Sequence, residues 1–225
     1  MSQPDAINEL LAEQAAYYRA IAPEYESLSI PGGGGEEVAA ALEVFRPIGD
    51  VLELACGPGM WTEILLRHAA ALTAVDAAPE MLARAKARVG ERRVRFLQAD
   101  LFSWRSEQRY DVVFFGFWLS HVPRERFEAF WALVNDCLEP GGRVFFVDDA
   151  FRPPEELIEG NSSSTIQRRT SNGASYRAVK VPYRPADLEE KLAALGWQFA
   201  VTQTSGTFYW GAGSRAQKSA TPVGL

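Results

Sequence analysis

The residues most able to do chemistry surround a glycine-rich turn, Gly57-Pro58-Gly59, which follows the apolar run Val51–Ala55. A glycine turn at the carboxyl end of a strand lets a ligand approach the backbone closely, and the amides of the next helix point at that ligand. Asp76 closes the following apolar run, 19 residues after Gly57. A carboxylate in that place can accept both hydroxyls of a ribose. Together these features predict a site for a nucleoside cofactor.

Four further residues narrow the kind of cofactor. A dinucleotide fingerprint needs a third glycine where Thr62 stands. Tyr176 and Lys180 have the spacing of the short-chain dehydrogenase pair, but their segment has strand composition, and side chains four residues apart align only on a helix. Glu53 stands where those enzymes need glycine. A carboxylate there suits a cationic cofactor better than a pyrophosphate.

His121 and three cations are the candidates for contact with a substrate. His121 follows the apolar run Val112–Leu119, and an imidazole with a pKa near 6.5 suits a general base. In that role it would make the rate rise with pH through roughly 6 to 7.5; alternatively, it caps a turn. Arg168, Arg169 and Lys180 occupy the two arms of a predicted hairpin. They contact a substrate or, alternatively, guard an exposed strand edge.

The elements that must position these residues alternate between strand and helix. Residues 6–20 have helical periodicity, and a second helix is opened by Pro79. The other predicted elements are strands over 51–55, 72–75, 94–97, 111–115 and 143–147, and helices over 61–70 and 124–138. This alternation implies parallel βαβ units with helices on both faces. The predicted fold class is therefore α/β, a Rossmann-like doubly wound sheet with an N-terminal helix.

The pattern changes after Asp149. Strands over 165–170 and 176–181 flank Asn172-Gly173, a strong hairpin signal. A helix over 185–195 and strands over 197–203 and 207–210 follow. Gly32 to Gly35 read as a loop, either a linker or a mobile segment over a pocket. The predicted organisation is an N-terminal helix and mobile cap (1–36), a cofactor-binding core (37–150), a hairpin insertion or lid (151–184), a final helix with antiparallel strands (185–213) and a flexible tail (214–225).

Composition excludes several classes of protein. A chain of 225 residues, 47% hydrophobic, can bury one sizeable core and favours a single domain with elaborations. No apolar run approaches the ~20 residues of a membrane span, and the N-terminus shows no secretory signal. Two widely separated cysteines lack metal-ligand spacing, so we expect a cytoplasmic protein without a disulfide or zinc site. A net charge of −6 argues against binding duplex DNA.

Four segments, in this order, resemble the motifs of class I S-adenosylmethionine (SAM) methyltransferases. Val51–Thr62 looks like motif I, and Asp76 resembles the acidic residue that binds the ribose. Gln98–Leu101 resembles the motif that flanks the adenine, with Asp100 facing its amine, and Leu138–Arg143 resembles the turn before strand five. The resemblance covers about residues 15–215. It implies SAM as cofactor and a seven-stranded sheet whose last strand is antiparallel.

A narrower resemblance is to small actinobacterial O-methyltransferases, which include a phosphonate O-methyltransferase of antibiotic biosynthesis. It is carried by Tyr17–Arg19, Phe114–Pro123, Arg126–Trp131 and Tyr176–Val181. The stretch after Pro31 is glycine where that relative is expected to have an aromatic substrate contact. This difference suggests a roomier site.

The two resemblances, with the residues above, give a set of site predictions. The expected contacts of the cofactor are Tyr18, Glu53, Ala55, Gly57, Gly59, Trp61, Asp76, Ala77, Met81, Asp100, Leu101, Phe115 and Trp118. The expected contacts of the substrate are Tyr25, Trp118, His121, Arg168, Arg169 and Lys180, with His121 as the catalytic base.

The predicted function is transfer of a methyl group from SAM to a hydroxyl of a small molecule, such as a sugar or secondary metabolite. One alternative is an anionic phosphonate or carboxylate oxygen, and another is a non-catalytic SAM-binding protein. The chemistry requires no metal, although some related enzymes use a divalent ion such as Mg²⁺. Gly116-Phe117-Trp118 lacks the pattern of enzymes that methylate base nitrogens, so no nucleic-acid partner is expected. The chain is expected to be a monomer or homodimer.

Overall fold

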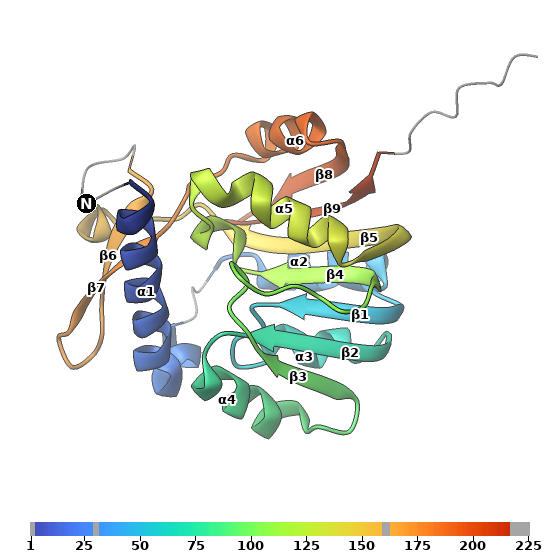
Figure 1. The fold of residues 1–225 in the computed structure, drawn as a ribbon, viewed down its shortest axis with the longest axis horizontal. Helices are drawn as coiled ribbons and strands as arrows, with labels where there is room; N and C mark the ends of the chain where they lie inside the picture. Colours follow the sequence, from blue (N-terminus) through green and yellow to red (C-terminus); the bar gives the residue numbers. More distant parts are fainter. Residues whose placement is uncertain (1–2, 29–31, 159–162, 217–225) are drawn as a thin grey trace, which may run out of the picture.

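A seven-stranded sheet forms the centre of the computed structural model, which describes residues 3–28, 32–158 and 163–216 (Figure 1). The strand order is β3-β2-β1-β4-β5-β9-β8. The strands are β1 Gly49–Leu54, β2 Ala69–Asp76, β3 Val94–Gln98, β4 Tyr110–Gly116, β5 Leu138–Asp149, β8 Trp197–Gln203 and β9 Phe208–Arg215. All neighbouring pairs are parallel except those made by β9, which is antiparallel to β5 and β8. The predicted fold class and the antiparallel last strand are confirmed.

Helices cover both faces of this sheet because its central strands are apolar on both sides. In β4, Val112, Val113, Phe114 and Phe115 are all buried, as expected for strands buried on both faces. One face packs against α2 Gly35–Phe45, α3 Met60–Leu65 and α4 Pro79–Val89, and the other against α5 Phe127–Asp136 and α6 Pro185–Ala194.

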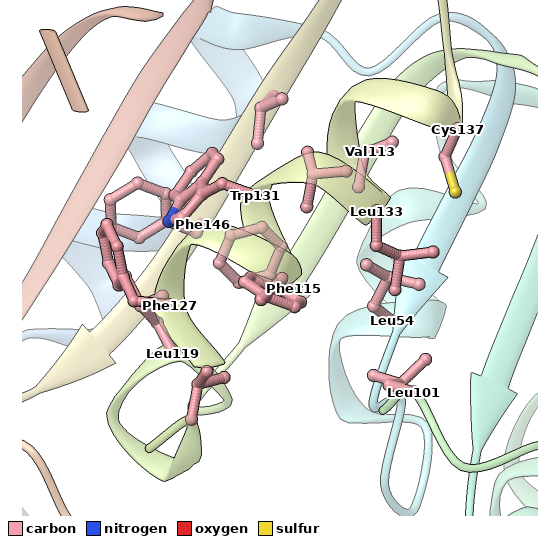
Figure 2. Close-up of a cluster of buried hydrophobic side chains, with 14 of the residues drawn as sticks. Leu54, Leu101, Val113, Phe115, Leu119, Phe127, Trp131, Leu133, Cys137 and Phe146 are labelled. Atoms are coloured by element: carbon pink, nitrogen blue, oxygen red, sulfur yellow. The ribbon is translucent and has the colours of Figure 1, made fainter. Parts of the chain in front are cut away.

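The face under α5 holds an aromatic cluster (Figure 2). The ring of Trp131 on α5 lies 5.8 Å from that of Phe115 and 6.2 Å from that of Phe146, measured between centroids. Aromatic pairs at such distances bury large areas in preferred edge-to-face geometry. This packing fixes α5 and the end of β4, after which the chain turns toward His121.

A cover of two elements lies beyond the carboxyl ends of the parallel strands (Figure 1). One is α1, Gln3–Ile21, and the other is a separate two-stranded sheet of β6 Thr165–Arg169 and β7 Ser175–Val179. The two elements lie side by side (Figure 1), and the Glu13 carboxylate accepts a hydrogen bond from Nε of Arg177 at 2.8 Å. Short 3-10 helices occupy 22–28, 119–121, 124–126 and 154–156.

The main differences from the sequence prediction concern the ends of elements. The helix expected over 61–70 ends at Leu65, because the chain must turn before β2 begins at Ala69. Helix α2 was not predicted; it begins at Gly35, inside the expected loop. Residues 214 and 215 of the expected tail belong to β9, which pairs with β5 as far as Ser214 and with β8 as far as Arg215. The remainder of that tail, 217–225, lies outside the described residues.

Within the ranges that the structure describes, no helix is long and apolar enough to cross a membrane.

Candidate active site

The glycine turn lies between β1 and α3, at the point where the sheet order reverses between β1 and β4. Gly57 and Gly59 have φ of +52° and +83°, a region that favours glycine. Asp76, at the end of β2, closes the turn: its Oδ2 accepts the N–H of Gly57 at 2.8 Å, and its Oδ1 accepts that of Ala78 at 2.9 Å. Burial raises the pKa of Asp76. In doubly wound sheets the crevice at such a reversal is the usual ligand site.

A cavity of about 610 Å³ opens above this turn. Its floor is built by the ends of β1, β2, β3 and β4, and its roof by α1. The lining residues are Asn8, Leu11, Ala12, Gln14, Ala15, Tyr18, Arg19, Tyr25, Ala55, Gly57, Asp76–Ala78, Met81, Gln98–Phe102, Gly116–Trp118, His121 and Arg126. We call it the first cavity.

One end of the first cavity is apolar and aromatic. The rings of Trp118 and Phe102 lie 5.5 Å apart, and Leu101 is buried beside them. The Asp100 carboxylate accepts the N–H of Phe102 at 2.9 Å. The buried indole Nε1 of Trp118 has no hydrogen-bond partner among the residues the structure describes. A flat apolar slot with a nearby carboxylate suits a planar nitrogen heterocycle.

A second cavity, of about 680 Å³, adjoins the first. The two share Tyr18, Tyr25, Phe117 and His121. The rest of the second cavity is lined by Tyr17, Ile21, Gly32–Glu37, Met60, Trp61, Asp149, Arg168, Lys180, Ser205 and Phe208. The two cavities therefore meet at these four shared side chains.

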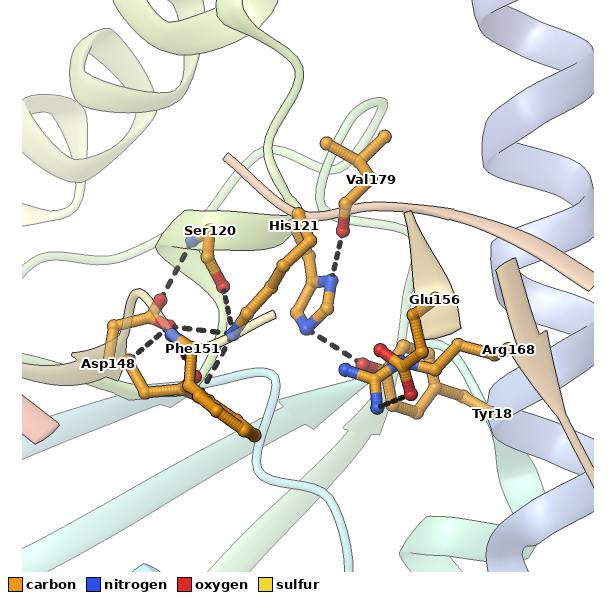
Figure 3. A network of polar contacts seen from close by, with 10 residues as sticks. Tyr18, Ser120, His121, Asp148, Phe151, Glu156, Arg168 and Val179 are labelled. Atoms are coloured by element: carbon orange, nitrogen blue, oxygen red, sulfur yellow. Dashed lines mark hydrogen bonds and ion pairs between the residues drawn. The ribbon is translucent and has the colours of Figure 1, made fainter. Parts of the chain in front are cut away.

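His121 is buried in the shared wall (Figure 3). Its Nδ1 lies 2.6 Å from the carbonyl oxygen of Val179, and its Nε2 lies 2.8 Å from the hydroxyl of Tyr18. A carbonyl can only accept a hydrogen bond, so the proton is assigned to Nδ1, and Nε2 accepts from Tyr18. Burial, with the charges of Lys180 and Arg168, lowers the pKa of His121 well below its usual value. The imidazole is therefore neutral near pH 7, with its lone pair already engaged.

The three cations of the hairpin are placed differently from one another. Arg168 lines the second cavity, and its Nη1 donates to Glu156 at 2.9 Å (Figure 3). Lys180 also lines that cavity, but its ammonium group donates to Asp149 at 2.9 Å and to Ser120 at 3.1 Å. Arg169 is exposed and lines neither cavity, because successive side chains of a strand point to opposite faces. Its role as a substrate contact stays a prediction, which the lining of the two cavities does not support.

Most of the residues predicted to bind the cofactor line the first cavity. They are Tyr18, Ala55, Gly57, Asp76, Ala77, Met81, Asp100, Leu101 and Trp118. Tyr25 and His121 line both cavities, and Trp61 lines only the second, where its ring packs against Phe117 with centroids 6.4 Å apart.

Three predicted cofactor residues line neither cavity. The ring of Phe115 faces α5, stacked in the aromatic core. Gly59 packs against α4, where an added Cβ would lie 3.0 Å from Cα of Ala85. Glu53 is buried and accepts the Thr62 hydroxyl at 2.6 Å; burial raises its pKa to about 8, so it is largely protonated at pH 7. Gly59 and Glu53 therefore support the glycine turn, whereas Phe115 belongs to the core under α5.

Sequence reasoning missed the side chains by which α1 roofs the first cavity. Among them, Gln14 is 4% exposed, and both ends of its amide are hydrogen bonded. The one available signal was a polar residue on the face that carries Leu10, Leu11 and Tyr17. Periodicity shows that a helix exists but does not show which part of the molecule it covers.

No group of three or more His, Cys, Asp or Glu side chains in the described part of the chain is arranged to hold a metal ion.

The doubly wound fold, the glycine turn and the first cavity indicate an enzyme that binds a nucleoside cofactor. Comparison with known proteins identifies its family. Residues 51–142 match a family model described as a methyltransferase domain. The DhpI–SAH complex is 40% identical, covers 93% of this chain and 98% of that chain, and has a TM-score of 0.80. The chain belongs to the class I SAM-dependent methyltransferases, and its cofactor is SAM.

Three further comparisons show similarity to this chain. The DhpI–SAM–HEP complex is also 40% identical, with a TM-score of 0.80 over 91% of this chain and 97% of that chain. The trans-aconitate 2-methyltransferase of Streptomyces avermitilis is 30% identical over 177 residues, 75% of this chain. The enzyme of that name from Escherichia coli is 35% identical over 111 residues, 48% of this chain. The matches span 64% and 40% of the lengths of these two enzymes.

Proposed function

We propose that the first cavity holds SAM and that the second holds the methyl acceptor. Asp76 would receive the ribose hydroxyls, since a carboxylate has about four acceptor positions and the amides of Gly57 and Ala78 occupy two of them. Leu101 and Trp118 would flank the adenine. When bound, SAM supplies a methyl group carried on a sulfonium centre.

The residues of this chain would act mainly by positioning. An acceptor oxygen in the second cavity can face the methyl end of the first cavity past Tyr18, Tyr25 and His121. Holding two reactants in line can contribute ~7–11 kcal/mol to the lowering of the barrier. The roof formed by α1 would exclude water from that line.

We infer that the acceptor atom is an anionic oxygen of a small molecule, a carboxylate or a phosphonate. The observation that carries this inference is Arg168, a guanidinium in the wall of the second cavity. Its Nη1 bonds to Glu156, while its buried Nε has no hydrogen-bond partner among the described residues. Arg168 thus keeps donors for an anion. The names of the trans-aconitate relatives and the resemblance to a phosphonate O-methyltransferase support the same acceptor class.

The state of His121 also favours an anionic acceptor. An ionised oxygen needs no base, whereas a neutral hydroxyl must lose its proton during the transfer. The lone pair of His121 is engaged by Tyr18. A hydroxyl of a sugar or secondary metabolite remains the second candidate, because His121 borders both cavities and could act as base once Tyr18 moved away.

Initial-rate kinetics with SAM and three probes, trans-aconitate, methylphosphonate and a simple sugar, would test the proposal. For an acidic probe, Arg168→Ala should raise KM roughly tenfold or more, because a charge-assisted hydrogen bond contributes ~1.5–3 kcal/mol. Arg169→Ala is the matched control: it removes the same charge from the exposed face of the same strand and should leave KM within about twofold.

Two results would contradict the anionic acceptor. One is turnover of the sugar but of neither acid, and the other is an equal effect of the two arginine substitutions. If SAM bound but none of the three classes of probe was methylated, the non-catalytic alternative would gain support.

A further inference from the structure

Gln14 joins three elements of the structure. It lies on α1 with only 4% of its surface exposed. Its Nε2 donates to the carbonyl oxygen of His121 at 3.3 Å, and its Oε1 accepts the N–H of Val179 at 2.9 Å. One side-chain amide thus binds α1 to the 3-10 helix Leu119–His121 and to the end of β7.

The side chain of His121 makes a second set of links between the same elements (Figure 3). Its Nδ1–H donates to the carbonyl oxygen of Val179, and its Nε2 accepts the hydroxyl of Tyr18 on α1. Val179 therefore gives its N–H to Gln14 and receives a hydrogen bond from His121. The three elements form a closed ring of hydrogen bonds, all buried or partly buried. They cannot separate without leaving buried polar groups unpaired.

This ring connects the walls of the two cavities. Helix α1 roofs the first cavity and contributes Tyr17 and Ile21 to the second. The hairpin contributes Arg168 to the second cavity. Because Gln14 and His121 tie the helix to the hairpin, an opening of one cavity also loosens the wall of the other.

We propose that Gln14 is a positioning residue that couples the two cavities. Occupation of the first cavity orders α1, and the bonds of Gln14 transmit that order to β7 and so to the hairpin that carries Arg168. Each ligand then raises the affinity for the other, since coupling between sites is reciprocal. The inference rests on the proposed function only for the assignment of the second cavity to the acceptor.

Hydrogen exchange with and without SAH tests this coupling, because SAH occupies the cofactor site without turnover. We expect SAH to slow exchange of the amides of 175–179 by about fivefold or more in the parent. In Gln14→Leu this protection should fall below about twofold, while protection of α1 itself persists. Glu13→Ala is the matched control, because Glu13 also bonds to β7, at the backbone N–H and the side chain of the partly exposed Arg177; the amide of Arg177 itself is left out of the comparison. This variant should behave like the parent.

Two outcomes would overturn the proposal: equal protection of 175–179 in the parent and in Gln14→Leu, or no protection there in the parent. If Gln14→Leu fails to fold in a thermal melt, Gln14→Glu replaces it. That variant keeps an acceptor for the N–H of Val179 and loses the donor to His121, so its protection should be intermediate; unchanged protection would contradict the role of Gln14. No acceptor is present in these experiments, so a wrong acceptor class would not alter them.

Discussion

Asp76 uses its two carboxylate oxygens to hold the backbone of the cofactor turn, and this geometry leads to a first prediction. Asp76→Ala should weaken SAM binding by roughly 1.5–3 kcal/mol, as expected for lost hydrogen bonds to a charged group. Gly57→Val should also weaken binding, because a branched residue is strained at φ +52°. Isothermal calorimetry with SAM measures both effects. Unchanged affinity in both variants would contradict the placement of SAM in the first cavity.

His121 gives a second prediction, on the pH dependence of the rate. Burial and the charges of Lys180 and Arg168 lower its pKa well below its usual value, which favours the neutral imidazole. The rate should therefore be flat with pH from about 6 to 7.5, not rising as the sequence suggested. His121→Gln should keep kcat within about fivefold of the parent, since glutamine also has one donating and one accepting end, whereas His121→Ala should lose more.

A matched set of rate–pH profiles over pH 5.5–8.5 decides between the two roles of His121. A rate that rises through pH 7, together with equal loss of kcat in both variants, would restore His121 as general base.

The lowered pKa of His121 also affects the stability of the fold. Because the unfolded chain gains a proton near pH 6.5 and the folded chain does not, stability should decline as pH falls below 6.5, and His121→Gln should remove that part of the decline.

Individual site residues were predictable where they lie at the carboxyl end of a parallel strand. The glycine turn and Asp76 lie at strand ends, and parallel strands bring their carboxyl ends to one edge. Phe115 and Arg169 lie outside both cavities, because the face of the strand decides the surroundings of each side chain. For a strand buried on both faces, such as β4, the sequence contains no alternation that would identify the face toward the site.

At the scale of elements, the loop before α2 is more firmly held than its glycines suggest. The carbonyl oxygen of Gly33 accepts hydrogen bonds from the Thr204 hydroxyl and the Phe208 amide, both at 2.9 Å. A Cβ on Gly34 would lie 2.4 Å from Oγ1 of Thr204, while one on Gly32 would meet nothing within 4 Å. Both glycines have positive φ, +91° and +74°. Alanine substitutions at Gly32 and Gly34 therefore separate the cost of backbone strain, which both share, from the cost of steric contact, which only Gly34 has.

Gly34→Ala should accordingly destabilise the protein by about 1–3 kcal/mol more than Gly32→Ala, because overpacking adds to the shared strain. Chemical denaturation of the two variants measures the difference. Since Gly34 lines the second cavity, Gly34→Ala should also alter acceptor kinetics. Equal stability of the two variants would mean that the loop does not rest on Thr204.

The order of elements was more predictable than their ends. The hairpin around Asn172-Gly173 and the helix stopped by Gly196 formed as expected, because turn residues have local conformational preferences. Helix α2 was missed because it begins within a glycine run and is fixed by packing of Val38 and Leu42 under the sheet. Contacts between distant segments are not visible in local composition.

At the scale of the whole molecule, the sheet and its cover enclose the first cavity between them, so binding of SAM or SAH at the proposed site should stabilise the entire fold. A ligand at about 100 times its Kd adds ~2.7 kcal/mol to stability. For a chain of this size each kcal/mol raises Tm by roughly 2–4 °C. Saturating SAH should therefore raise Tm by about 5–10 °C in a thermal-shift measurement, and NADH at the same concentration should not.

The doubly wound sheet itself followed from the alternation of strands and helices, and the resemblance to methyltransferases implied its antiparallel last strand. The position of α1 and of the hairpin over that sheet did not follow. It depends on contacts such as that of the Gln14 side chain with the carbonyl oxygen of His121, 107 positions away in the sequence. Long-range pairs of this kind decide the shape of the site and leave no periodic trace in the chain.

Within the described residues, neither β6 nor β7 pairs with a strand of the large sheet; the small sheet has one further bridge, between Leu157 and Ile166 of β6. Its exchange for another hairpin would therefore leave the hydrogen-bond ladder of the cofactor half intact. Sequence changes confined to the hairpin of β6 and β7 would alter the choice of methyl acceptor among homologues, while the turn at Gly57 and Asp76 stayed constant. A chimera that grafts residues 164–180 from a relative would transplant acceptor preference, provided that the graft preserves the two backbone groups of Val179 that dock on Gln14 and His121.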